Sequence, residues 1–148
     1  MVISSSRIDK RKRILKLNYS TRIELEPAAG FDAPQTTEIK LCGGVIHRVE
    51  VTIPDGAMDL VGVKIRNGLH QLWPTLEGTY FRGNGVTYSF RENYLLTKDV
   101  NILSVDCVNC DVVYLHAPIV TFAILPAKDV SPWLQADADR LSAFLGLN

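Results

Sequence analysis

The stretch from Val45 to Phe90 constrains the fold most, because apolar and polar residues alternate along it between tight-turn signals. Successive side chains of a strand point to opposite faces, so a period of two predicts a half-buried strand. In Val45–Ile53 the residues expected on one face are Val45, His47, Val49, Val51 and Ile53, and those on the other are Ile46, Arg48, Glu50 and Thr52.

Turn chemistry divides the same stretch into strands. Proline presets φ and glycine accepts the left-handed corner, so Pro54-Asp55-Gly56 predicts a turn. Asn67-Gly68 suits the two positive φ values of a type I′ turn and predicts a hairpin. Gly83-Asn84-Gly85 predicts a third turn. The strands expected between these turns cover residues 60–65, 69–73, 79–81 and 86–90.

Further strands are expected on both sides. The pattern predicts strands at 14–25 and 37–42, the second closed by Gly43-Gly44, and a connection at 92–99. A hairpin of 102–107 with 111–115 and a strand at 119–125 follow. Ser131 as N-cap and Pro132 at the first turn predict a final helix. The chain is therefore expected to be all-β, an antiparallel β-sandwich or jelly roll of about eight strands with a short C-terminal helix.

The 148 residues suit one domain. We expect a basic N-terminal arm at 1–13, a β-sandwich at 14–126 and a C-terminal helical segment at 127–148. The arm is either a solvated tail or a segment that docks on an acidic partner surface or a nucleic acid; its basic residues are Arg7, Lys10, Arg11, Lys12 and Arg13. The helical segment is apolar enough to pack on the sandwich or on a partner, through Trp133, Leu134, Leu141, Phe144 and Leu145.

The totals exclude several classes of protein. Sixteen basic and sixteen acidic residues give zero formal net charge, so nothing steers the whole molecule to nucleic acid or to an anionic membrane. No apolar run approaches the roughly 20 residues of a membrane helix. The first residues, MVISSS, lack the features of a signal peptide, so we expect a protein made in a cytoplasm and not secreted. Three cysteines argue against a disulfide framework.

No residue pattern predicts a catalytic, metal or cofactor site, and we expect no enzyme activity. Cys107 and Cys110 have CxxC spacing, but a zinc site needs about four ligands and only Cys42 remains. A redox pair would sit at a helix N-terminus, whereas these two flank an expected hairpin turn. His47, His70 and His116 fall on separate expected strands without ligand spacing.

Three aromatic residues are candidates for a ligand or protein interface: Trp73, Tyr80 and Phe81. Aromatic side chains anchor cores and protein interfaces, and displayed in a row they stack on sugar rings. A carbohydrate-binding sandwich is therefore the alternative function, and it requires Trp73, Tyr80 and Tyr88 to lie exposed together. An enzyme on a β scaffold is a third hypothesis, which requires two titratable groups converging in a pocket.

The series HRVEVTIPDGAMDLVGVKIRNGLHQLWP, GTYFRGNGVTYSF and VNCDVVYLHAPIVTFAIL resembles the single jelly-roll structural proteins of virus and phage particles. This resemblance implies a non-enzymatic virion component of a capsid, decoration or tail. It also implies a symmetric homo-oligomer whose terminal segments, the basic arm and the apolar helix, bind neighbouring protein subunits. No cofactor and no membrane are implied.

Overall fold

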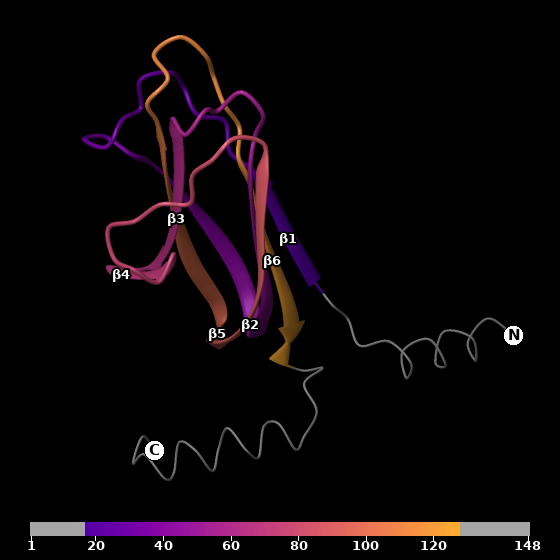
Figure 1. The fold of residues 1–148 in the computed structure, drawn as a ribbon. Coiled ribbons are helices and arrows are strands. Elements are labelled where there is room, and N and C mark those ends of the chain that lie inside the picture. The colour runs from indigo at the N-terminus through magenta and orange to yellow at the C-terminus, as the bar shows by residue number, and fades with distance from the viewer. Residues whose placement is uncertain (1–16, 128–148) are drawn as a thin grey trace, which may run out of the picture.

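The computed structural model describes residues 17–127, which form one antiparallel sheet of six strands (Figure 1). The prediction of an all-β antiparallel fold is confirmed, whereas the finer prediction of an eight-stranded sandwich or jelly roll is not confirmed. The basic arm and the C-terminal helical segment lie outside the described residues, apart from Ala127. The strands, in the spatial order β1-β6-β2-β5-β3-β4, are β1 Leu17–Arg22, β2 Gln35–Ile53, β3 Val61–Asn67, β4 His70–Trp73, β5 Val86–Asn109 and β6 Ile119–Pro126.

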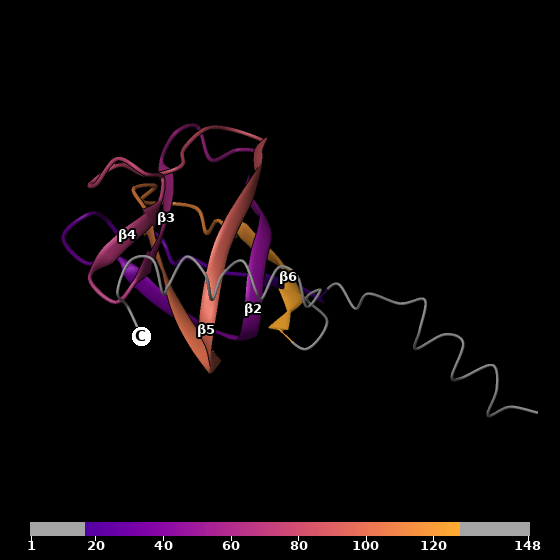
Figure 2. The same cartoon turned by 90° about the horizontal axis from the view of Figure 1, so that it is seen from below.

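Two long strands, β2 with 19 residues and β5 with 24, form the centre of this sheet. They pair from Gln35↔Cys107 at one extreme to Ile53↔Val86 at the other. The register shifts between Cys42 and Gly44, opposite the stretch of β5 before Val100. Both strands bend here. One half of each strand therefore lies on one side of the molecule and the other half on the opposite side (Figure 2).

Two glycines make this bend possible, because side chains would collide with neighbouring backbone. A Cβ at Gly43 would lie 2.6 Å from the carbonyl oxygen of Lys98, and one at Gly44 would lie 2.0 Å from that of Leu125. Gly44 also has a φ of 150°, which favours glycine. The prediction that Gly43-Gly44 closes one strand before another begins is therefore wrong: the pair forms a bulge within the continuous β2.

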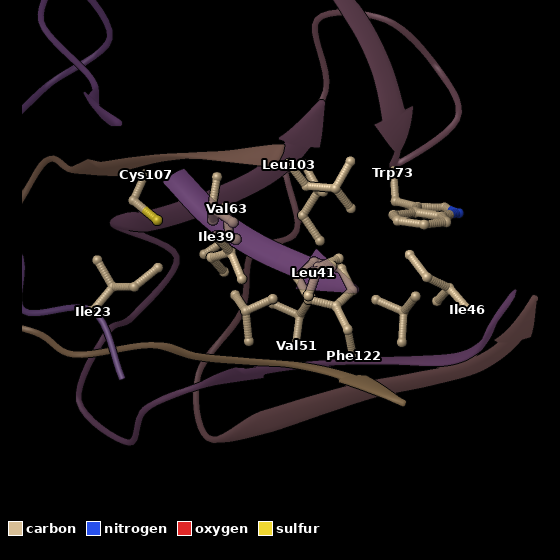
Figure 3. Close-up of a cluster of buried hydrophobic side chains, with 14 of the residues drawn as sticks. Ile23, Ile39, Leu41, Ile46, Val51, Val63, Trp73, Leu103, Cys107 and Phe122 are labelled. Atoms are coloured by element: carbon tan, nitrogen blue, oxygen red, sulfur yellow. The ribbon is translucent and has the colours of Figure 1, made fainter. Parts of the chain in front are cut away.

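The bend closes the sheet over one hydrophobic core. Trp73 of β4 and Phe122 of β6 come from opposite sides of the strand order, yet their ring centroids are 6.3 Å apart. Figure 3 shows Leu41, from the first half of β2, pointing toward Val51 and Phe122. Burial of such apolar surface stabilises the fold by about 25 cal/mol per Å².

A second register shift, between Ile46 and Arg48, changes which residues of β2 face this core. Ile46, Val49, Val51 and Ile53 are all fully buried. The prediction that Val45 and His47 share the face of Val49 is wrong, because the bulge at His47 adds a residue and reverses the alternation before it. In β1 and in residues 86–90 of β5, exposure alternates as expected of half-buried strands.

Three other sequence predictions are wrong. Residues 92–99 belong to β5 rather than to a connection, and residues 111–115 form a loop rather than the second arm of a hairpin. Residues 79–81 form no strand, and only Phe81 makes an isolated bridge, to Val63. The predicted hairpin at residues 60–73 is confirmed as β3 and β4. Asn67 pairs with His70, so Gly68 and Leu69 are the central turn residues, and only Gly68 has a positive φ. Glycine at the first position with an ordinary residue after it suits a type II′ turn, so the predicted type I′ turn at Asn67-Gly68 is wrong.

The strands run between two distinct ends of the molecule. The loop end consists of segments 23–34, 54–60, 82–85 and 110–118 (Figure 1). The bend end holds the bulge of β2, the β3–β4 turn and both limits of the described chain, because Leu17 pairs with Ile124 and Pro126 pairs with Gly44.

We expect Gly44→Ala to lower the free energy of unfolding by at least about 2 kcal/mol, since the added methyl group meets backbone that cannot rotate away. Urea unfolding followed by tryptophan fluorescence measures this loss. Gly30→Ala is the control: nothing lies within 4 Å of its added Cβ, and a change within about 0.5 kcal/mol is expected. Equal effects of the two substitutions would contradict the role given to Gly44.

Candidate functional site

Four consecutive apolar side chains project into solvent from segment 110–118 at the loop end. The exposed fractions are 75% for Val112, 67% for Val113, 67% for Tyr114 and 44% for Leu115. Single exposed apolar residues are ordinary, but a contiguous group marks an interaction surface. We call residues 112–115 the apolar loop.

Asn109, at the end of β5, fixes the base of the apolar loop. It is fully buried, and its backbone N–H donates to the carbonyl oxygen of Ala29 at 2.7 Å. Its side-chain amide Nδ2 lies 3.2 Å from the carbonyl oxygen of Leu25 and 3.0 Å from that of Tyr114. Its Oδ1 accepts from the backbone N–H of Asp111 at 3.0 Å. One buried amide therefore ties the loop to segment 23–34.

Asp111 holds the two sides of the apolar loop together. Its Oδ1 accepts from the backbone N–H groups of Val113 and Tyr114 at 2.9 and 3.2 Å. Its Oδ2 lies 2.9 Å from Nε2 of His116, a residue that is 8% exposed. The backbone hydrogen bond from Val113, and then the contact with His116, hold the pKa of Asp111 below its usual value. The loop is thus held by directional bonds, not by burial of its own side chains.

Neighbouring segments extend the apolar surface. Cys110 donates its backbone N–H to Leu60 at 2.7 Å, and Ala28 donates to Asp111 at 2.8 Å. These bonds place exposed residues of three segments at one end of the molecule. Besides the apolar loop, the exposed large apolar residues of the loop end are Phe31, Met58 and Leu60.

Phe31 is one of a small group of aromatic and basic side chains. Its ring packs edge-on against Tyr80 at 5.5 Å, and the guanidinium of Arg82 lies 4.8 Å from its centroid. The ammonium group of Lys64 lies 4.9 Å from the centroid of Tyr80. A cation over an aromatic face is attracted by the ring quadrupole, so these contacts hold the half-exposed Phe31 in place.

The charge of the loop end is mostly negative. Its four segments contain six carboxylates and a single arginine, Arg82. Glu24 is paired with Arg22 of β1 at 2.7 Å, and Asp111 with His116. The loop end is therefore acidic; its carboxylates are Glu24, Glu26, Asp32, Asp55, Asp59 and Asp111.

The three aromatic residues singled out from the sequence do not form one exposed row. Trp73 is 5% exposed and packs in the core against Phe90 and Tyr94. Phe81 lies against Tyr88, with ring centroids 5.1 Å apart. Of the three, only Tyr80 reaches the loop end, through its contact with Phe31. The row required for stacking on sugars therefore lacks Trp73.

The cysteines and histidines are dispersed. Cys42, Cys107 and Cys110 are free thiols, and burial raises the pKa of Cys107 to about 12. A thiol with this pKa stays protonated near neutral pH and is a poor nucleophile. Within residues 17–127, no three His, Cys, Asp or Glu side chains are grouped to hold a metal ion. In the same range, no helix is long and apolar enough to cross a membrane.

Two hollows lie away from the loop end. One, of about 550 Å³, lies beside the second bulge of β2 and is lined by His47, Arg48 and Arg91, with Glu92 and Asn93. Arg48 is already paired with Glu50 at 2.9 Å and bonded to Ser89, so its charge is largely satisfied. The other, of about 280 Å³, lies at the bend end between Asn67 and the stretch 94–102.

The apolar loop was not predicted from the sequence. Residues 111–115 were expected in a strand because Val, Val, Tyr and Leu favour strands. The contrary signal was present in Asn109 and Asp111, since Asn and Asp side chains bond to nearby backbone groups and so compete with a ladder. The arm and C-terminal residues proposed as partner contacts lie outside the described residues.

No known protein family matches the chain, and no curated protein matches it in sequence.

We expect Asp111→Asn to lower the free energy of unfolding at pH 7, and this difference from the wild type to shrink as the pH falls. The pKa of Asp111 in the folded protein is lower than its ordinary 3.8. The stability that the carboxylate contributes is therefore fully present above that value and is lost as the pH falls through the folded pKa. Urea unfolding in steps from pH 7 to pH 3 measures the effect.

Val113→Ser is the control for this series, because it alters the same loop without changing an ionisable group. Its difference from the wild type should not vary with pH. A difference between Asp111→Asn and the wild type that stays constant from pH 7 to pH 3 would show that the carboxylate does not stabilise the loop.

Proposed function

We propose that this protein is a non-enzymatic structural component of a virus or phage particle, which assembles with other protein subunits through the loop end. The observation that carries the proposal is the apolar loop: four adjacent apolar side chains are held out in water by a hydrogen-bond framework. Burying such side chains against a partner contributes roughly 1.5–3 kcal/mol each to the free energy of association. A protein interface therefore offsets the unfavourable exposure of these side chains to water.

Backbone strain at the same end supports this proposal. The non-glycine residues with positive φ among residues 17–127 are Ala28, Met58 and Asp59, and all three lie in loop-end segments. Such conformations cost of order 1–3 kcal/mol and persist where the surrounding structure enforces them, frequently at binding sites. Met58 is 67% exposed, so its strained backbone displays one more apolar side chain.

The fold that we propose for this subunit is a jelly roll, and the bent sheet supports it. Two halves of β2 and β5 lie on either side of one core, as the two layers of a sandwich do. Long strands that pass from one layer to the other through bulges are a known way to build the corners of such folds. A rigid block of this kind, with its loops at one end, suits a repeated subunit of a capsid, decoration or tail.

The carbohydrate-binding alternative receives less support. It needs an exposed aromatic row, and Trp73 lies in the core. Tyr80 and Phe31 remain as a half-exposed pair, but they are packed against each other and against Lys64 and Arg82 rather than set in a cleft. An assembly surface accounts for the apolar loop, which a sugar site formed by this pair leaves unused.

We expect the full chain to self-associate and the double variant Val113→Ser, Tyr114→Ser to lower its solution mass. The variant removes apolar surface from the interface but leaves Asn109, Asp111 and the core in place, so the fold should be retained. Light scattering at several protein concentrations gives the mass, and circular dichroism checks the fold.

The matched control is the double variant Leu69→Ser, Leu76→Ser. These leucines are 98% and 71% exposed, so the control removes similarly exposed apolar side chains outside the loop end. It should leave the mass unchanged. Equal masses for the wild type and the apolar-loop variant would count against an assembly function of this surface.

A further inference from the structure

The zero net charge of the chain conceals an uneven distribution. Residues 17–127 contain 12 carboxylates and 8 basic side chains, whereas residues 1–16 contain six basic side chains and one carboxylate. The loop end is acidic, with six carboxylates against Arg82, of which Glu24 and Asp111 are paired with Arg22 and His116. The basic arm and the loop end are therefore complementary in charge.

They are also opposite in position. Leu17, the first described residue, pairs with Ile124 at the bend end, and β1 runs from there toward the loop end. Leu25 reaches the base of the apolar loop, where it bridges to His116. The chain before residue 17 therefore departs from the end of the molecule that is farthest from the acidic surface (Figure 1).

This geometry favours a second copy over the arm's own subunit. The eight residue steps from Leu17 to Leu25 span about 26 Å at the rise of a strand. An extended chain gains at most about 3.6 Å per residue, so Arg13 reaches about 14 Å back from Leu17 and Lys10 about 25 Å. Four of the arm's five basic residues, from Lys10 to Arg13, therefore fall short of their own apolar loop, which lies beyond Leu25; only Arg7, at most about 36 Å from Leu17, could reach it. The length of the chain before Leu17 sets no such limit on contact with the loop end of a neighbouring copy.

We propose that residues 7–13 of one copy bind the loop end of a second copy, joining subunits head to tail. This inference rests on the proposed assembly function and names the partner of its surface. The basic side chains of the arm pair with carboxylates of the loop end, and Ile8 supplies an apolar contact for Val112–Leu115. Charge pairs at the rim and apolar contacts at the centre are the usual anatomy of a protein interface.

Three full-length variants test the inference. The arm variant carries Lys10→Gln, Arg11→Gln and Arg13→Gln. The loop-end variant carries Glu26→Gln, Asp32→Asn and Asp59→Asn. The control variant carries Glu38→Gln, Glu77→Gln and Asp99→Asn, which removes the same charge from exposed positions outside the loop end.

Light scattering should show self-association of the wild type and of the control variant. The arm variant and the loop-end variant should each associate at least about tenfold more weakly. An equimolar mixture of these two should form a heterodimer and nothing larger, because an intact arm meets an intact loop end only once in each pair. Raising the salt from 0.05 to 0.5 M should weaken wild-type association, since ions screen the charges.

If both charge variants associate as strongly as the wild type, the head-to-tail inference is overturned. A mixture of the two variants that stays monomeric would also overturn it. If the apolar-loop serine variant dissociates while both charge variants remain associated, the inference fails and the assembly function stands. A wild-type chain that is monomeric up to about 100 µM, well above the Kd of a specific interface, would overturn both.

Discussion

The close approach of three backbone segments at Gly43 and Gly44 is the contact on which the rest of the structure depends. β2 can be packed between β5 and β6 at this point only because neither residue has a Cβ. The bend that follows brings Trp73 and Phe122 together and closes the core. It also gathers the loops at one end and both limits of the described chain at the other. The shape of the candidate interface is therefore a consequence of backbone packing far from it.

The core and the loop end are stabilised by different physics. Apolar burial is non-directional, so it closes the bent sheet without fixing the path of a loop. The apolar loop has the opposite requirement, because its side chains would collapse onto the protein if nothing held them out. Asn109 and Asp111 supply directional bonds instead. The buried amide is costly to leave unsatisfied, which makes the observed loop path strongly preferred over alternatives.

Local sequence patterns predicted the elements whose geometry is decided locally. The β3–β4 hairpin follows from turn chemistry, and residues 86–90 of β5 follow from their alternation. The continuity of β2 could not be predicted, because Gly43-Gly44 reads equally as a turn or as a bulge until the partners Lys98 and Leu125 are known. The reversal at His47 has the same origin. At the candidate site, Tyr80 was found from its residue type, whereas the apolar loop was hidden by strand-forming residues that a polar framework overrides.

Net charge is a poor guide to association for a chain built in this way. Screening limits charge effects to about 8–10 Å at ordinary salt concentrations. A subunit therefore does not respond to the total charge of its neighbour. It responds to the charges that touch, and here the chain enters β1, after its basic residues, at the end opposite the acidic loop end. A contact between unlike surfaces is heterologous, so each copy keeps one free arm and one free loop end until a ring closes or a stack continues. The angle at which the proposed head-to-tail contact joins successive copies then determines which of these assemblies forms.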